Sequence, residues 1–140
     1  ASTGAVTGVS AGTSVITYTI TGTGGCANAT TTATVTVTAA PNAGTVSGTQ
    51  GICSATTTTF TTTGTGGTWS SGTTAVATVN ATSGLVAGLS AGTSTITYTV
   101  IGTGGCANAT ATRDVTVTLA PASGLPVSSD IFPFTAGTCA

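Results

Sequence analysis

Residues 81–121 read ATSGLVAGLSAGTSTITYTVIGTGGCANATATRDVTVTLAP, and residues 1–41 are a near-copy, ASTGAVTGVSAGTSVITYTITGTGGCANATTTATVTVTAAP. When Ala1 is aligned with Ala81, 29 of the 41 positions are identical. Self-similarity at a fixed period indicates one structural unit that is used in series. The period, the interval from Pro41 to Pro121, is too long for one rung of a solenoid and suits a small independent β domain.

The composition excludes most chemistry. The chain has one Lys or Arg, two Asp or Glu and no His among 140 residues. General acid–base catalysis, Ser-His-Asp triads and two-carboxylate glycosidase sites all need titratable groups that this chain lacks. Zinc needs His or clustered Cys and calcium needs several carboxylates. We therefore expect a protein that is not an enzyme and that has no metal and no other cofactor.

Charge and hydropathy restrict the partners. The net charge of −1 leaves no basic surface for phosphates, so nucleic acid is not an expected partner. Gly or Thr interrupts every apolar run well before about 18 residues, so we expect no membrane span. A chain with so little charge also lacks the usual protection against self-association. We therefore expect it either to be part of an assembly or to be covered by sugar.

The setting is predicted from cysteine and from the first residues. Four Cys without His or CxxC spacing indicate disulfides, and disulfides favour an oxidising, extracellular location. No initiator Met and no signal-peptide pattern stands at Ala1, which suggests either a processed chain or part of a longer protein.

The complete unit, residues 41–120, shows a series of short strands. Thr, Val, Ile and aromatic residues dominate its runs, Gly and Asn separate them, and no helical period appears. We expect seven strands, at 44–48, 56–63, 68–71, 75–79, 85–89, 93–101 and 110–118. Alternation along them predicts a core made of Phe60, Trp69, Val76, Ile96, Tyr98, Val100, Val115 and Val117. This pattern is typical of an all-β, immunoglobulin-like β-sandwich with Greek-key connections.

A family resemblance points the same way. Residues 68–100, TWSSGTTAVATVNATSGLVAGLSAGTSTITYTV, resemble the bacterial immunoglobulin-like repeats of the invasin and intimin type. The flanking stretches PNAGTVSGTQGIC and GTGGCANATATRDVTVT are similar to units repeated many times in giant gliding adhesins of Bacteroidetes, which the type IX secretion system exports. The resemblance covers residues 1–120. It implies a β-sandwich spacer or adhesive module on the bacterial cell surface, with a role in cell adhesion and gliding motility.

The two ends of the chain hold incomplete units. Residues 1–40 match only the last three strands of a unit, and about 40 residues rarely fold unaided. Their apolar face therefore needs complementation. Residues 121–140 depart from the repeat and form a divergent tail, either the start of a next unit or a donor strand. The apolar residues that this tail offers are Leu125, Val127, Ile131, Phe132 and Phe134.

The cysteines suggest two pairings. Within the complete unit only Cys53 and Cys106 occur, and we expect them to form an intradomain disulfide that clamps the two sheets. Cys26 is the repeat equivalent of Cys106, and Cys139 lies about where the first Cys of a next unit would fall. A Cys26–Cys139 bond between subunits is one hypothesis, and pairing of both outside this chain, or of neither, is the other.

Three functions are compatible with these features. The first is a disulfide-clamped structural and adhesive spacer at the extracellular surface, in contact with neighbouring repeats and with surface glycans or other cells. The second is a subunit of an extracellular filament, in which copies join head-to-tail by β-strand complementation. The third, a carbohydrate- or ice-binding module, rests on the outward ladder Thr34, Thr36 and Thr38, which ordinary β-propensity also explains.

Overall fold

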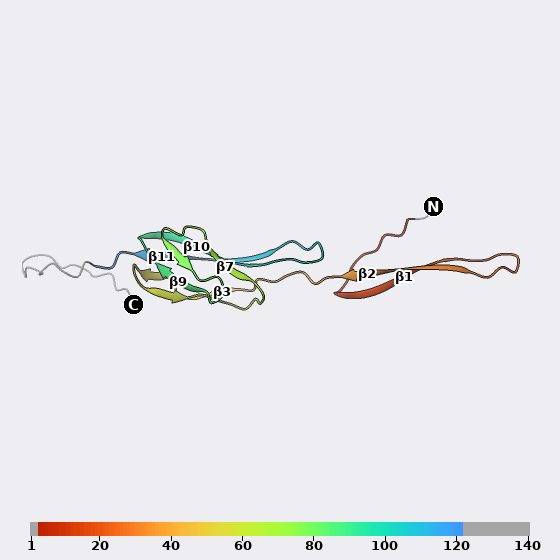
Figure 1. Ribbon diagram of the computed structural model, residues 1–140, viewed down its shortest axis with the longest axis horizontal. Helices are drawn as coiled ribbons and strands as arrows, with labels where there is room; N and C mark the ends of the chain where they lie inside the picture. The colour runs from red at the N-terminus through yellow and green to blue at the C-terminus, as the bar shows by residue number, and fades with distance from the viewer. Residues whose placement is uncertain (1–2, 122–140) are drawn as a thin grey trace, which may run out of the picture. The chain divides into compact units, whose positions relative to one another are not determined.

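The computed structural model describes residues 3–121 (Figure 1). Within this range the chain forms strands and turns and no helix. It divides into two compact units, one made of Ala1–Pro41 and Gly102–Ala107, the other of Asn42–Ile101 and the residues from Asn108 onward. The loop 102–107, which the repeat assigns to the complete unit, thus clusters with Ala1–Pro41.

The first unit contains one antiparallel hairpin, β1 (Gly12–Ile20) and β2 (Ala29–Val37). The strands pair without a bulge along their whole length, from Gly12 opposite Val37 to Ile20 opposite Ala29. Gly24 and Gly25, with φ of 65° and 87°, occupy the centre of the connecting turn. Two successive residues with positive φ define the hairpin turn that matches the twist of the strands, and Gly adopts this conformation at no steric cost.

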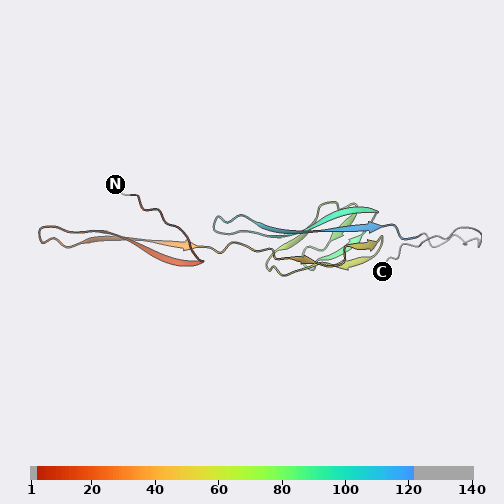
Figure 2. The ribbon, with the colours of Figure 1, turned by 180° about the vertical axis from the view of Figure 1, so that it is seen from behind.

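The second unit is built on a four-stranded sheet with the order β4-β11-β10-β7. Its strands are β4 (Gly51–Cys53), β11 (Ala109–Thr118), β10 (Gly92–Val100) and β7 (Thr68–Ser71). β10 and β11 form the second copy of the repeated hairpin, with the same register as β1 and β2 (Figure 2). β4 runs parallel to β11 at the edge of the sheet.

The remaining strands of the second unit form smaller sheets. β9 (Leu85–Gly88) pairs with β5 (Thr57–Thr59) on one side and with β8 (Ala77–Val79) on the other. β6 (Thr61–Thr62) follows β5 after a single residue and pairs with β3 (Val46–Ser47). The described chain is thus all-β with several sheets, an arrangement consistent with a β-sandwich.

A single apolar core lies in the second unit and takes residues from all of its sheets. Of the eight residues expected there, Val76 and Val100 are half-buried and pack against the core, and the other six are buried. The rings of Trp69 and Tyr98 pack against each other in this core, 4.8 Å apart between centroids and tilted by 53°. Further buried members are Ala43, Val46, Ile52, Ala77 and Val86.

Three details differ from the sequence-based expectation. Residues 51–53 form a strand that was not expected, and 56–63 is two strands interrupted at Phe60. The backbone amide of Phe60 leaves the ladder and donates to the carbonyl of Gly84 at 2.9 Å, while its ring is buried. The strand expected at 75–79 begins only at Ala77, so Ala77 takes the core position and Val76 lies in the turn before it.

The core includes one buried hydroxyl. Ser94 is 1% exposed, and its Oγ lies 2.8 Å from Ser71 Oγ and accepts the backbone N–H of Thr73 at 3.0 Å. Ser71 Oγ in turn donates to the carbonyl of Ala77 at 2.6 Å. Because each of these groups has a partner, the network connects β7, β8 and β10 without leaving a buried polar atom unsatisfied.

Candidate interaction surface

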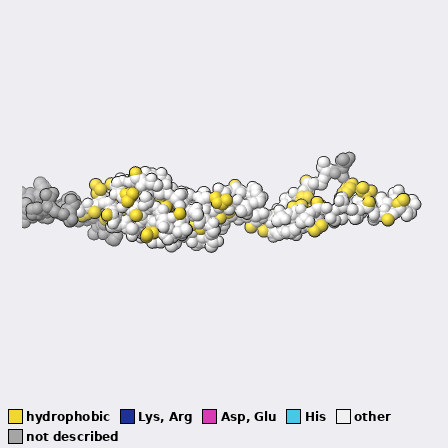
Figure 3. All heavy atoms as spheres, viewed as in Figure 1, with side chains coloured by type: hydrophobic (Ala, Val, Ile, Leu, Met, Phe, Trp, Pro, Cys, Tyr) yellow, Lys and Arg dark blue, Asp and Glu magenta, His cyan; other side chains and the backbone are white. Residues whose placement is uncertain are grey.

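The first unit exposes the side chains that the second unit buries. Ile16 is 39% exposed whereas its repeat equivalent Ile96 is 0% exposed. Tyr18 is 57% exposed against 6% for Tyr98. The residues are identical in type and the strands share one register, so the difference comes from what packs on them and not from local sequence. Figure 3 shows hydrophobic side chains, in yellow, at the surface of the β1–β2 hairpin.

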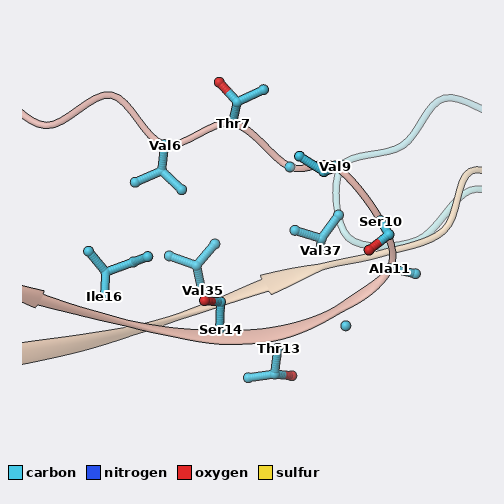
Figure 4. Close-up of a pocket in the computed structure, with 12 residues that line it drawn as sticks. Val6, Thr7, Val9, Ser10, Ala11, Thr13, Ser14, Ile16, Val35 and Val37 are labelled. Atoms are coloured by element: carbon cyan, nitrogen blue, oxygen red, sulfur yellow. The ribbon is translucent and has the colours of Figure 1, made fainter.

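This exposed face encloses a groove of about 420 Å³. One wall is the segment 6–13 and the other is the hairpin, with Ile16, Val35 and Val37 directed into the space between them (Figure 4). Val6, on the segment, faces the same space and is 54% exposed. Half of the twelve lining residues are Val, Ile or Ala, and the other half are Gly, Thr or Ser, such as Thr7 and Ser14. We define these lining residues of the first unit as the hairpin groove.

The repeat explains why the groove is apolar. Val6, Ile16, Val35 and Val37 correspond to Val86, Ile96, Val115 and Val117, all buried in the second unit. There, strands β3–β8 cover these positions and supply Phe60 and Trp69 as the largest partners. Residues 1–41 match residues 81–121 and contain no counterpart of those covering strands. The hairpin groove thus contains the equivalents of core residues without the strands that cover them in the second unit.

The predicted Cys53–Cys106 disulfide is wrong. Cys106 carries a free thiol, and Cys53 is held in a disulfide whose partner is therefore not Cys106. The reason is the parallel pairing of β4, which places Cys53 opposite Thr118 at the far end of β11. Cys106 precedes the other end of that ten-residue strand, about 30 Å away at 3.3 Å per residue. Disulfides need Cα atoms within about 7 Å, so the two cysteines cannot meet.

Other predicted residues lie outside what the structure can place. Cys26 is exposed and free in this single chain, and its pairing with a second subunit remains a prediction. Its suggested partner Cys139 lies outside the described residues, as do the donor residues Leu125, Val127, Ile131, Phe132 and Phe134.

The two charged side chains within residues 3–121 bind structural partners. Arg113 is half-buried on β11, and its guanidinium donates to the carbonyl of Gly48 at 3.1 Å and to that of Val46 at 3.5 Å. Asp114 accepts the hydroxyl of Thr95 at 2.6 Å on the neighbouring strand. The sequence analysis did not single out Arg113, whose two hydrogen bonds fix the end of β3. Nothing local to Arg113 signals a partner so distant along the chain.

The described residues offer neither a metal cluster nor a membrane-spanning helix. Between residues 3 and 121 no group of three or more His, Cys, Asp or Glu lies together as a metal ion would require. In the same range no helix is long and apolar enough to span a membrane.

The described chain is all-β, and its β10–β11 hairpin repeats the pairing of β1 and β2. No family model matches the chain, and no curated protein matches it. Among solved structures it is similar to the surface layer protein SbsC, domains 1–6, with 24% sequence identity and a TM-score of 0.32. The match covers 84% of this chain and 17% of that chain. A TM-score this low carries no argument about fold or function.

Proposed function

We propose that this chain is a segment of tandem immunoglobulin-like modules that does structural and adhesive work on a bacterial cell surface. One observation carries the proposal: the β10–β11 hairpin of a complete unit recurs one repeat period earlier with the same pairing. Modules in series, joined by short linkers such as the one at Pro41, form an extended spacer that holds a distal element away from the cell. The resemblance to invasin-type repeats of gliding adhesins supports this function.

The strand order supports an immunoglobulin-like module. Consecutive strands β3 and β4 lie in different sheets, and β4 pairs in parallel with the last strand, β11. β10 lies between β11 and β7, while β9 lies between β5 and β8. Sheets of this membership, with connections that cross from one to another, support the Greek-key immunoglobulin-like sandwich that we propose.

The polar chemistry supports a role without catalysis. The described surface offers Thr and Ser hydroxyls, and the charged pair Arg113 and Asp114 is already bound to backbone and hydroxyl groups. Hydroxyls without an adjacent base are weak nucleophiles, so we assign them to ordering the sheets and to contacts with hydrated partners such as glycans.

The spacer function predicts a simple length series. Chains with one, two and three copies of residues 42–121 should increase in maximum dimension, measured by small-angle X-ray scattering, by about 35–40 Å per copy. This increment follows from the length of β11, about 33 Å, plus a short linker. Modules that fold back on one another would give a constant dimension and would contradict the spacer.

The surface location needs a test in cells. An antibody raised against the complete unit should label intact cells that produce the protein, and brief protease treatment of those cells should remove the label. Labelling that appears only after the cells are permeabilised would refute a surface role. Beads coated with the chain and offered arrays of surface glycans then test the adhesive part.

A further inference from the structure

We propose that residues 121–140 of a second copy of this chain fill the hairpin groove, with residues 137–139 of that copy pairing alongside β2 as β4 pairs alongside β11. The copies then join head-to-tail, and each junction completes one half-unit. This assembly goes beyond the spacer role and stands or falls separately from it.

The register comes from the complete unit. There, Gly51, Ile52 and Cys53 pair in parallel with Thr116, Val117 and Thr118. The equivalent residues of the first unit are 36–38, on and just after β2, and among the described residues β2 pairs only with β1. The tail carries Gly137-Thr-Cys139, which repeats the Gly-x-Cys pattern of residues 51–53. The free edge of β2 therefore corresponds to the edge of β11 that pairs with β4, and residues 137–139 of the tail correspond to β4.

Two equivalent glycines show where the incoming strand lies. A Cβ atom placed on Gly88 would be 3.1 Å from Val117 Cγ1 and 3.0 Å from Ile52 Cδ1. A Cβ atom placed on Gly8 would be 3.0 Å from Cγ1 of Val37, the counterpart of Val117, and the two next nearest atoms also belong to Val37. The segment before β1 thus already lies on β2 as β9 lies on β11. One strand, the counterpart of β4, would complete this contact.

The tail has the right chemistry for the groove. The segment between Val127 and Cys139 is longer than its counterpart between Val46 and Cys53, and the additional residues include Ile131, Phe132 and Phe134. In the complete unit Phe60 and Trp69 pack in the core with the equivalents of the groove residues, and residues 1–41 contain no counterpart of these two aromatic residues. Phe132 and Phe134 supply large apolar side chains in their place, and burial of such rings against aliphatic walls drives association.

A free cysteine lies at the junction. The Cys106 thiol donates to the carbonyl of Thr38 at 3.8 Å, within the first unit. Thr38 is the counterpart of Thr118, the residue opposite Cys53, so Cys139 of the incoming tail would arrive beside Cys106. Cys26 lies at the opposite end of the hairpin, roughly 27 Å away along β2. The assembly therefore replaces the hypothesis of a Cys26–Cys139 bond with a Cys106–Cys139 contact that can be trapped as a disulfide.

This contact provides the experiment, which uses the Cys53→Ser chain. Cys53 is disulfide-bonded in the single chain, and its replacement removes it as a competitor in disulfide formation. In a buffer of oxidised and reduced glutathione, one thiolate attacks glutathione disulfide, and the second thiol displaces glutathione from the mixed disulfide. Two thiols thus become one protein disulfide and two reduced glutathione molecules. The Cys53→Ser chain should form a ladder of covalent species at multiples of about 13.0 kDa.

Second substitutions separate this geometry from others. In the Cys53→Ser chain, Cys106→Ser and Cys139→Ser should each abolish the ladder, whereas Cys26→Ser should leave it intact. An equal mixture of the Cys106→Ser and Cys139→Ser versions should give covalent dimers and nothing longer, because only one junction can close in each pair. Monomers in that mixture, or peptide mapping of Cys139 to Cys26, would overturn the proposal. Trp69 fluorescence confirms that each version keeps its complete unit folded.

A substitution in the groove tests the non-covalent contact of the otherwise native chain under reducing conditions. Val37→Lys places a charge where the apolar side chains of the tail would pack, and should raise the dissociation constant by about tenfold or more, measured by analytical ultracentrifugation. Val15→Lys, on the other face of β1, is the matched control and should leave the dissociation constant unchanged. A reduced wild-type chain that stays monomeric at every accessible concentration would refute the docking.

Discussion

The two copies of the hairpin allow one substitution to be tested in two environments. Ile96 and Ile16 occupy the same repeat position, and they are 0% and 39% exposed. Replacement of Ile96 with Ala removes three carbons from a closed core. The free energy of unfolding therefore falls both by the lost transfer free energy and by the cost of the cavity. Such replacements cost about 2–5 kcal/mol, and the complete burial of Ile96 favours about 3–4 kcal/mol.

The same replacement at Ile16 should have a much smaller effect. Ile16 borders an open groove, so no closed cavity forms, and roughly three-fifths of its surface is covered. At about 0.8 kcal/mol per buried methylene, the loss is about 1.5 kcal/mol and is confined to the first unit. The complete unit should keep its stability.

The single Trp makes the assay selective. Trp69 is the only Trp of the chain and lies in the second core, so its fluorescence in a urea titration reports the complete unit alone. With a slope near 1 kcal/mol per molar urea, Ile96→Ala should lower the midpoint by about 3 M. Ile16→Ala should leave the midpoint where it is, at low protein concentration and with reductant present.

A milder variant protects against a trivial failure. If Ile96→Ala does not fold, Ile96→Val should still fold and lose about 1 kcal/mol. Equal midpoint shifts for the two Ala variants would refute the reasoning, because they would make Ile16 part of the core that Trp69 reports.

Three further tests use the same titration. Gly84→Ala and Gly66→Ala both put Ala at a φ near 70°, which costs about 1–2 kcal/mol. Only at Gly84 would the new Cβ meet a backbone carbonyl, so only Gly84→Ala should abolish folding. Equal effects of the two substitutions would contradict this contact. Ser94→Ala should cost about 1–3 kcal/mol by leaving a buried hydrogen-bond network incomplete, whereas Ser14→Ala, on the exposed copy, should be neutral. Tyr98→Phe should cost about 1 kcal/mol, because its hydroxyl accepts a backbone N–H at 2.8 Å, and an unchanged midpoint would exclude that bond.

Local periodicity was the reliable part of the sequence. The strand 68–71 was predicted at its observed limits, and the repeated hairpin within one residue. The alternation of side chains along these strands, and turn residues such as Gly104 and Gly105, depend only on neighbours in the chain. The local sequence therefore indicates directly which strands pair across a turn and which face is buried.

Long-range pairing was the unreliable part. β4 spans only Gly51–Cys53 and owes its strand conformation to β11, the last strand of the unit. No pattern in residues 51–53 indicates that partner or the register that places Cys53 opposite Thr118, at the end of β11 far from Cys106. The disulfide prediction failed at this step. Alignment of the two copies shows that residues 1–41 lack the covering strands, and complementation of their exposed apolar face stays a prediction.

The parallel pairing of β4 with β11 has a mechanical consequence for a module stretched along a chain of its own kind. Tension enters through the residues before β4 and leaves through the residues after β11, so it pulls the two strands past each other along their common axis. Their ladder bonds, including Thr116 N–H to Gln50 O at 2.7 Å and Ser54 N–H to Thr118 O at 2.8 Å, are then loaded in shear and must break together rather than one by one. The short edge strand β4 thereby holds the module closed against this force.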